Sequence, residues 1–150
     1  MAEAKPNILI IDDEPGVCWA LSELAKSMGY DAQAASEAEK GLEVLASGGV
    51  DVVVLDIQLP GLNGLEALPK ISADHPQVPV VVITAHGTME TAVAAVQRGA
   101  FEYLLKPVDM ATLKTVLAAA VERRRREAEL AAPPEPVSDS DIVGQCPQMQ

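Results

Sequence analysis

The sequence predicts a doubly wound α/β domain, in which a five-stranded parallel sheet carries helices on both faces. Short apolar runs alternate five times with segments of helical periodicity. Three of these runs consist almost entirely of Val, Ile and Leu, which is typical of strands that are covered on both faces. Right-handed crossovers between parallel strands then place the helices in two layers.

The apolar runs predict the strands, in chain order. The first is NILII, the third is VVVL and the fourth is VVVI, whereas the second run, YDAQAA, is far less apolar. The five predicted strands are Asn7 to Ile11, Tyr30 to Ala35, Val52 to Leu55, Val80 to Ile83 and Phe101 to Leu105.

The first two helices have recognisable ends. Pro15 suits the first position of a helix, and the apolar stripe that follows stops at Gly29. Ser36 and Glu39 have the spacing of a capping box, which predicts a second helix that ends at Gly48.

The remaining three helices are marked in the same way. Asn63 is a candidate cap for the third helix, and Pro69 is expected to shorten or bend it. Thr88 is a candidate cap for a fourth helix that ends at Gly99, and Asp109 for a fifth. The fifth helix is predicted to run from Met110 to about Leu130, well beyond the sheet.

The pattern ends at Ala131. The segment AAPPEPVSDSD holds three prolines and no periodic apolar positions, which predicts an extended linker. We therefore expect one domain over residues 1–130, followed by a linker and the truncated start of another domain over residues 131–150.

Charge and hydropathy exclude several classes of protein. Residues 1–110 hold 16 acidic and 6 basic side chains, a net charge of −10, which repels nucleic acid. The basic cluster from Arg123 to Arg126 is interleaved with Glu122, Glu127 and Glu129, and the pairs Glu122/Arg126, Arg123/Glu127 and Arg125/Glu129 indicate a solvated helix face rather than a DNA contact. Apolar stretches such as Val78 to Ile83 are too short to span a bilayer, and the first residues do not resemble a signal peptide. These features predict a cytoplasmic protein with no membrane contact and no direct binding of nucleic acid.

Polar side chains follow four of the five predicted strands. Asp12 and Asp13 follow the first strand, Asp56 the third, Thr84 the fourth and Lys106 the fifth. Ligands of an open parallel sheet bind at the carboxyl ends of its strands, so we expect these side chains to share one edge. Each position alone has a structural explanation, such as acidic residues at a helix amino terminus, and it is their coincidence that favours a functional site.

Three carboxylates in one cleft need a positive group to offset their repulsion. Lys106 is one candidate, and a hard divalent cation is the other. The strand ends carry no His or Cys, which favours Mg²⁺ over zinc. A metal ion, a lysine and a hydroxyl together suit phosphoryl transfer, with an aspartate as the nucleophile.

These segments resemble the receiver domains of two-component response regulators. The matching stretches are IIDDEPGV, DVVVLDIQLPGLNGLEAL and VPVVVITAHGTMETAVAAVQRGAFEYLLKPVD, within about residues 5–125. The last stretch and the tail DIVGQ look like the NtrC-like activators, in which a receiver precedes an ATPase domain that works with sigma-54. The resemblance implies a flavodoxin-like sheet of order 2-1-3-4-5.

The resemblance also implies a role for each site residue. Asp56 would accept a phosphoryl group from the phosphohistidine of a sensor kinase, Lys106 would pair with the phosphate, and Thr84 would donate its hydroxyl to a phosphate oxygen. Asp13, Asp56 and the Gln58 carbonyl would hold Mg²⁺, and Asp12 would act mostly through a bound water. Tyr103 would be the switch aromatic that turns inward when Thr84 moves; its alternative is a half-buried sheet tyrosine with its hydroxyl in water.

Phosphorylation would then shift the face formed by the fourth helix, fifth strand and fifth helix, and so control a homodimer and the downstream ATPase and DNA-binding domains. His86 is expected to line the entrance of the site. The chain would catalyse only its own phosphorylation and dephosphorylation. The enzyme alternative is a Mg²⁺-dependent phosphatase of the haloacid dehalogenase type, although that family has a second Asp where this chain has Gln58.

Overall fold

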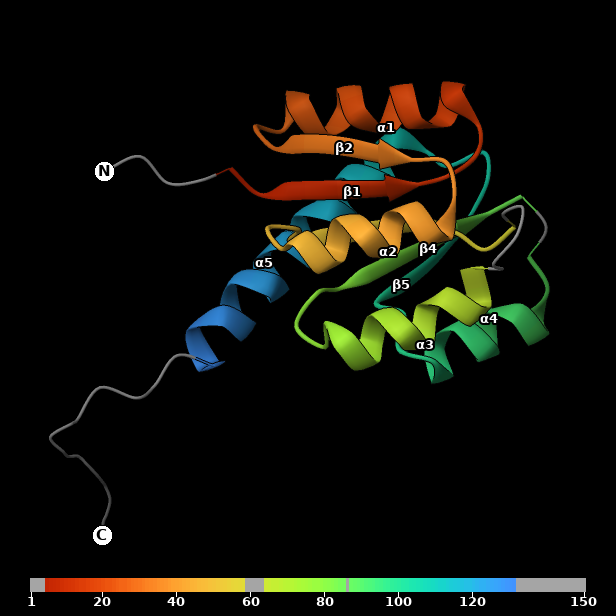
Figure 1. Ribbon diagram of the computed structural model, residues 1–150. Helices are drawn as coiled ribbons and strands as arrows, with labels where there is room; N and C mark the ends of the chain where they lie inside the picture. Colours follow the sequence, from red (N-terminus) through yellow and green to blue (C-terminus); the bar gives the residue numbers. More distant parts are fainter. Residues whose placement is uncertain (1–4, 59–63, 86, 132–150) are drawn as a thin grey trace, which may run out of the picture.

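Five parallel strands form a single sheet in the order β2-β1-β3-β4-β5, as predicted. The computed structural model describes residues 5–58, 64–85 and 87–131. The strands are β1 (Asn7–Ile11), β2 (Asp31–Ala35), β3 (Val52–Asp56), β4 (Val80–Thr84) and β5 (Glu102–Leu105). All five point the same way, so their carboxyl ends share one edge (Figure 1).

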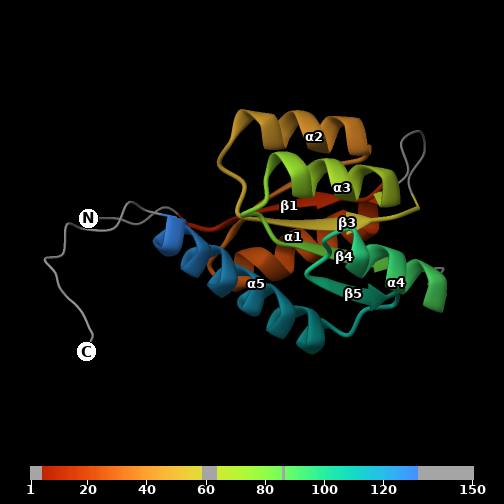
Figure 2. The ribbon, with the colours of Figure 1, turned by 90° about the horizontal axis from the view of Figure 1, so that it is seen from below.

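The helices lie in two layers that cover the two faces of the sheet (Figure 2). One face packs against α1 (Pro15–Ser27) and α5 (Met110–Ala131), and the other against α2 (Ala38–Ser47), α3 (Gly64–Asp74) and α4 (Met89–Gln97). Within the described residues, no helix combines the length and the apolar character that crossing a membrane requires.

Alternation along the strands explains the two cores. Leu9, Val53 and Val82 belong to the cluster that packs on α2 and α3, whereas Ile10 and Val54 belong to the cluster that packs on α1 and α5. Every residue of β3 and β4 is buried, because both of these central strands are covered on both faces. The nearly continuous Val, Ile and Leu runs are therefore a direct consequence of the layer arrangement.

The second and fifth strands begin one residue later than predicted, at Asp31 and Glu102. Tyr30 instead completes the end of α1: its N–H donates to Ala25 O at 2.9 Å, and Gly29 N–H donates to Lys26 O at 3.0 Å. Gly29 has a φ of +87°, the left-handed conformation that this helix ending requires. The N–H groups of Gly29 and Tyr30 are used by the last carbonyls of α1, so pairing of β2 with β1 begins at the next residue, Asp31.

The predicted capping box of α2 is wrong. Glu37, not Ser36, is the N-cap, and it makes no side-chain capping bond. Ser36 therefore precedes the N-cap, and Glu39 is the second residue of the helix and not the third, so the two cannot form a capping box. Ala38 and Gly41 are fully covered in the first turn, and a Cβ at Gly41 would lie 2.3 Å from Ile11 Cδ1. Packing of this turn on β1 thus decides where α2 begins.

Two other predicted caps are confirmed. Thr88 and Thr91 form a reciprocal capping box at α4, and Asp109 Oδ2 accepts the N–H of Thr112 at 3.1 Å at the start of α5. Asn63 lies outside the described residues. Pro69 does not end α3, since the helix continues to Asp74.

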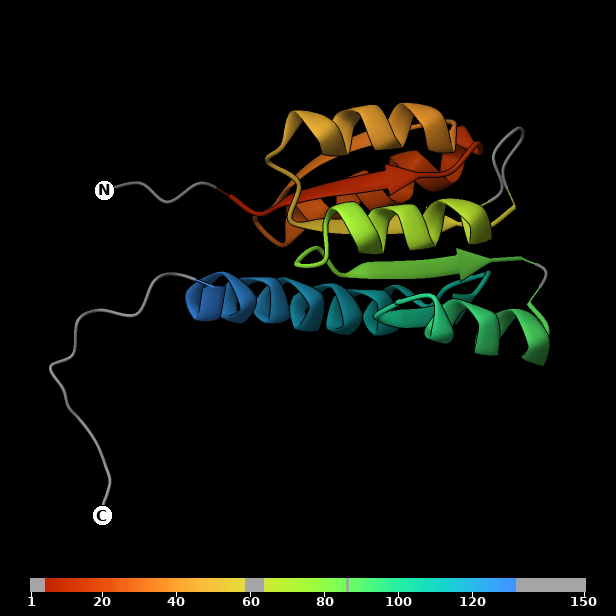
Figure 3. The ribbon, with the colours of Figure 1, turned by 60° about the horizontal axis from the view of Figure 1, so that its bottom comes forward.

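The basic cluster on α5 is only partly a solvated face, which corrects the prediction. Arg124 lies 3.7 Å from Asp51 at the amino end of β3, and Arg123 stacks over Phe101 at 5.4 Å. Glu122 pairs with Arg125 at 3.8 Å rather than with Arg126. The other two predicted pairs involve Glu127 and Glu129, whose side chains lie outside the described part of the structure. These contacts hold α5 against the amino edge of the sheet, and the helix then runs past that edge (Figure 3).

Replacing Gly64 with alanine is expected to destabilise the domain by about 1–3 kcal/mol. A Cβ at Gly64 would lie 2.4 Å from Ile57 Cα and 2.5 Å from Asp56 O, and backbone cannot move aside cheaply. Gly16 in α1 is the matched control, because nothing lies within 4 Å of its Cβ position. Urea unfolding should show a loss for Gly64→Ala and none for Gly16→Ala; equal midpoints would contradict the close approach.

Candidate functional site

The site lies at the carboxyl edge of the sheet, where strand order reverses between β1 and β3. Asp12 and Asp13 directly follow β1, and Asp56 is the last residue of β3, the neighbouring strand. One carboxylate oxygen from each of the three lies within 4.8 Å of the others. The predicted convergence of these carboxylates at a topological switch point is therefore present.

Burial distinguishes the three carboxylates. Asp12 and Asp56 are buried, at 1% and 4% exposure, whereas Asp13 is exposed. Backbone amides hold the two buried groups in place: Glu14 N–H donates to Asp12 Oδ1 at 2.9 Å, and Gln58 N–H donates to Asp56 Oδ1, also at 2.9 Å. Both buried carboxylates are thus positioned before any ligand arrives.

Lys106 reaches this cluster from the segment after β5. Its Nζ lies 2.9 Å from Asp12 Oδ2 and 3.0 Å from Asp56 Oδ2. It also donates to Glu14 Oε1 at 2.7 Å, a contact that the sequence analysis did not predict. The peptide bond from Lys106 to Pro107 is cis. One ammonium group therefore faces three carboxylates from two different segments.

The pKa directions follow from this crowding. Burial raises the pKa of Asp12, and the nearby Asp56 charge adds to that rise, while the hydrogen bond from Glu14 N–H and the close Lys106 ammonium oppose it. Burial alone would lower the pKa of Lys106, but its close contacts with the Glu14, Asp12 and Asp56 carboxylates outweigh burial and raise it. The hydrogen bond from Lys106 lowers the pKa of Glu14. Lys106 is thus firmly cationic at neutral pH.

Thr84 and Tyr103, the two residues predicted to act as the switch, lie on neighbouring strands. Thr84 is fully buried at the end of β4, and Val82 on that strand pairs in register with Tyr103 on β5. Tyr103 is half-buried, as expected for a sheet tyrosine, but its hydroxyl contacts another side chain instead of water alone. It lies 2.8 Å from Thr91 Oγ1 on α4. His86, expected at the entrance, lies outside the described residues.

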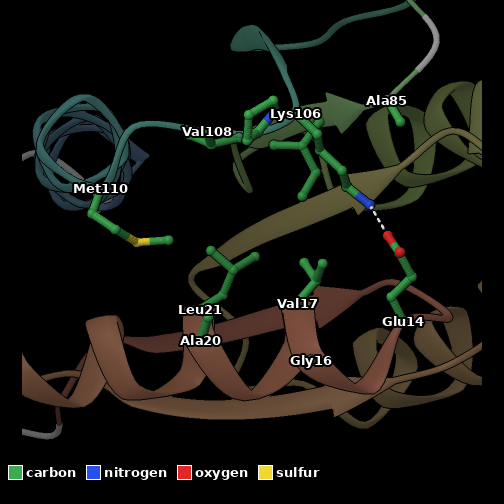
Figure 4. A pocket seen from close by; sticks show the side chains of 11 residues that line it. Glu14, Gly16, Val17, Ala20, Leu21, Ala85, Lys106, Val108 and Met110 are labelled. Carbon is green, nitrogen blue, oxygen red and sulfur yellow. Dashed lines mark hydrogen bonds and ion pairs between the residues drawn. The ribbon is translucent and has the colours of Figure 1, made fainter.

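An apolar groove runs beside Lys106, between α1 and the segment that joins β5 to α5 (Figure 4). Its volume is about 470 Å³. Val17 and Leu21 of α1 face Val108 and Met110 across it, and the Glu14 to Lys106 ion pair closes one end (Figure 4).

The acidic cluster fits a divalent cation. The Lys106 ammonium contacts the carboxylates of Asp12, Glu14 and Asp56, and the Asp13 carboxylate lies near those of Asp12 and Asp56, so negative charge exceeds positive charge in this cluster. Asp12 Oδ2 is buried; Lys106 approaches it at ion-pair distance, but it accepts no well-directed hydrogen bond within the described part of the chain. Hard carboxylate oxygens without histidine or cysteine suit Mg²⁺.

The family model for the response regulator receiver domain matches residues 8–118. This chain belongs to the receiver-domain family of response regulators. The receiver domain is 37% identical over 147 residues to the response regulator protein PilR of Pseudomonas aeruginosa, covering 98% of this chain and 32% of that protein. It is 39% identical to the nitrogen assimilation regulatory protein NtrX of Azorhizobium caulinodans, covering 93% of this chain and 32% of the relative.

Solved structures agree with this assignment. The crystal structure of NtrX from Brucella abortus superimposes with a TM-score of 0.78 at 34% identity, covering 86% of this chain and 30% of that chain. A receiver domain from Clostridium thermocellum gives a TM-score of 0.76 at 32% identity, covering 81% of this chain and 98% of its own. The domain is thus of the NtrC, NtrX and PilR type, and it spans about a third of the length of its curated relatives. These matches do not support the phosphatase alternative.

Glu14 is the residue of this site that the sequence analysis missed. Glu14 directly precedes Pro15, where an acidic residue suits a helix amino terminus, and it lies 92 residues from Lys106 along the chain. The acidic run from Asp12 to Glu14 was a usable signal, because a lysine at the same sheet edge can reach any member of it.

Proposed function

We propose that this receiver domain is a phosphorylation-controlled switch, in which Asp56 accepts a phosphoryl group from the phosphohistidine of a sensor kinase. The observation that carries the proposal is the placement of Asp56. Its carboxylate is buried at the carboxyl edge of the sheet, with one oxygen held by Gln58 N–H and the other by Lys106. A nucleophile oriented in this way suits in-line phosphoryl transfer.

The transfer converts Asp56 into an acyl phosphate. A carboxylate oxygen of Asp56 attacks phosphorus while the bond from phosphorus to the donor nitrogen breaks. Lys106 then pairs with a phosphate oxygen and Thr84 donates its hydroxyl to another, which offsets the added charge of roughly −1.5 to −2. In this proposal the chain catalyses only its own phosphorylation and, with water as the attacking group, its own dephosphorylation.

The acidic cluster supports a Mg²⁺ site for this reaction. Asp13, Asp56 and the Gln58 carbonyl would hold the ion, and Asp12 would act through a bound water. When bound, Mg²⁺ supplies positive charge to the phosphate oxygens. The Gln58 N–H and the Lys106 ammonium keep the Asp56 carboxylate aligned for attack.

Replacing Asp13 with asparagine is expected to weaken Mg²⁺ binding by about 10- to 100-fold, because one anionic oxygen ligand becomes neutral. Asp13 is exposed, so the folded state should tolerate the change. Isothermal titration calorimetry with MgCl₂ measures the effect, and Asp31→Asn at the opposite edge of the sheet is the control. Unchanged affinity in Asp13→Asn would remove Asp13 from the ligand set.

The apolar groove beside Lys106 supports a protein as the donor. A donor that delivers a phosphoryl group to Asp56 has to cover this edge, and the groove between Val17 and Val108 is apolar surface next to it. Trp19 on α1 is also exposed, at 69%. Apolar surface of this kind is typical of protein contacts.

The proposed output is a rearrangement of the face formed by α4, β5 and α5. Tyr103 connects β5 to α4 through Thr91, so movement at Thr84 and Tyr103 would reach this face. We propose that the full-length protein is cytoplasmic and that this face controls its downstream ATPase and DNA-binding domains. The signal would pass through residues 131–150, the proposed linker and start of the next domain. Ala131 is the last residue of α5, and residues 132–150 lie outside the described part of the chain.

We also propose that this face forms a homodimer. Met89, Val93 and Val96 of α4 and Leu105 of β5 are large apolar side chains with 48–81% exposure. Sedimentation equilibrium with and without a beryllofluoride phosphate mimic measures the association. A monomer in both conditions at high concentration would refute the dimer.

The test of the switch is incubation with acetyl phosphate and Mg²⁺, followed by intact-mass measurement. A single phosphoryl adduct and no sustained turnover of phosphomonoesters supports the switch. Steady hydrolysis of many phosphomonoesters without an adduct would refute it.

A further inference from the structure

Helix α4 is held in place by little apolar burial. Ala95 is its single fully buried side chain. On its outer side, Met89, Val93 and Val96 are 81%, 48% and 62% exposed. A helix with so few buried contacts is easily displaced, so its polar contacts at either end matter for its position.

The amino end of α4 is tied to β5. Thr91 Oγ1 accepts Thr88 N–H at 2.8 Å within the capping box and lies 2.8 Å from the Tyr103 hydroxyl. Tyr103 is one of the two proposed switch residues, so this contact is part of the proposed switch. It leaves open what holds the other end of the helix.

The carboxyl end of α4 is tied to α3 by Arg98. Its Nη1 donates to Leu65 O in the first turn of α3 at 2.7 Å. Four residues further along α3 stands Pro69, which has no N–H, so the helix cannot supply its usual i+4 donor to this carbonyl. The Arg98 guanidinium, a charged donor from the neighbouring helix, takes the position of that missing donor.

A second contact aligns the same two helices. The Ser72 hydroxyl donates to Arg98 O at 3.1 Å. The next residue, Gly99, has a φ of +108°, and a Cβ there would lie 2.3 Å from Ser72 Oγ. Arg98 is therefore held by α3 through both its backbone carbonyl and its side chain (Figure 1 shows the two helices).

The first turn of α3 is itself fixed to the backbone of the phosphoacceptor. Gly64 N–H donates to Ile57 O at 3.1 Å, and the Gly64 Cα faces the Asp56 carbonyl at a separation that leaves no room for a side chain. Leu65 is the next residue. The Arg98 bond thus joins the carboxyl end of α4 to the turn that packs directly behind Asp56.

We propose that Arg98 is a positioning residue: by bonding the Leu65 carbonyl that Pro69 cannot serve, it ties α4 to α3 and restrains the rearrangement of α4 that follows phosphorylation of Asp56. The tie acts at the opposite end of α4 from the Tyr103 contact. Its regulatory consequence rests on the proposed function, whereas the tie itself rests on the two helices alone.

A double-mutant cycle on the 150-residue chain tests the tie through backbone amide hydrogen exchange. Arg98→Met is expected to speed exchange of the amides in the carboxyl half of α4 on the order of tenfold, the loss expected for one charged hydrogen bond, with α1 amides unchanged. In Pro69→Ala, the restored N–H serves Leu65 O within α3, so adding Arg98→Met should then change exchange by less than about twofold. Lys70→Met, which removes an exposed positive charge from α3, is the control.

The switch itself provides the second readout. With acetyl phosphate and Mg²⁺, Arg98→Met should show a larger phosphorylation-dependent change in α4 exchange than the wild type, at equal phosphoryl occupancy by mass. Unchanged α4 exchange in Arg98→Met, or an equally large effect in the Pro69→Ala background, would overturn the tie. If the wild type takes up no phosphoryl group, the proposed function fails. The double-mutant cycle, read by hydrogen exchange without phosphorylation, still tests whether Arg98 ties α4 to α3.

Discussion

Replacing Asp56 with asparagine is expected to lower phosphoryl incorporation from acetyl phosphate by at least about a thousandfold. The amide of asparagine is nearly the same size as the carboxylate but is a far weaker nucleophile. It can keep the hydrogen bond from Gln58 N–H to a side-chain oxygen, so the local backbone should persist. Intact-mass measurement of the acyl phosphate in the presence of Mg²⁺ checks the result.

The matched control is Asp74→Asn, an exposed aspartate at the end of α3. It removes the same charge from the chain without touching the cluster, and its adduct should form at the wild-type rate. If Asp56→Asn formed as much phosphoryl adduct as the wild type, the phosphoacceptor would be another residue. Asp12 and Asp13 are the first alternatives at this edge.

Replacing Lys106 with methionine is expected to lower the free energy of unfolding by about 2–4 kcal/mol near neutral pH without divalent cations. The side chain keeps its apolar length but loses the ammonium, which leaves the buried carboxylates of Asp12 and Asp56 facing each other uncompensated. Urea unfolding measures the loss, and Lys114→Met on the exposed side of α5 is the control. Saturating Mg²⁺ should restore part of the loss, since a ligand that binds the folded state stabilises it.

The loss in Lys106→Met should shrink as the pH falls. Burial already raises the pKa of Asp12, and removing the nearby ammonium raises it further. The folded state then binds a proton more tightly than the unfolded state, so the stability of the variant rises as the pH falls from neutral toward the ordinary aspartate range, about pH 4. A deficit that stays constant over this range would show that charge repulsion is not its cause.

Local patterns were sufficient to predict the five strands and five helices in their order along the chain. The apolar runs of β1, β3 and β4 are explained by burial on both faces, and Pro15, Thr88 and Asp109 mark helix starts that the structure confirms. The polar residues after the strands were placed at one edge by the parallel topology alone. These signals lie within a few residues of each other, so a single sequence carries them in full.

Predictions that depended on which neighbour packs against a segment were less accurate. The capping box at Ser36 failed because packing of α2 on Ile11 set a different first turn. The basic cluster of α5 was expected to be a solvated face, but Arg124 lies 3.7 Å from Asp51 at the amino end of β3 and Arg123 stacks over Phe101. In each case a contact between distant segments outweighed a weak local preference.

From its sequence alone, this protein could be predicted to be a parallel α/β domain with an acidic site at the carboxyl ends of its strands, because strand burial follows from short-range patterns, and its motifs could be seen to resemble those of receiver domains. The tertiary structure alone decided that Lys106 is shared with Glu14, that the Tyr103 hydroxyl contacts Thr91, and that Arg98 serves the carbonyl opposite Pro69. These contacts join segments 12 to 92 residues apart. Their partners are chosen by how the helices pack on the sheet, which no local pattern encodes.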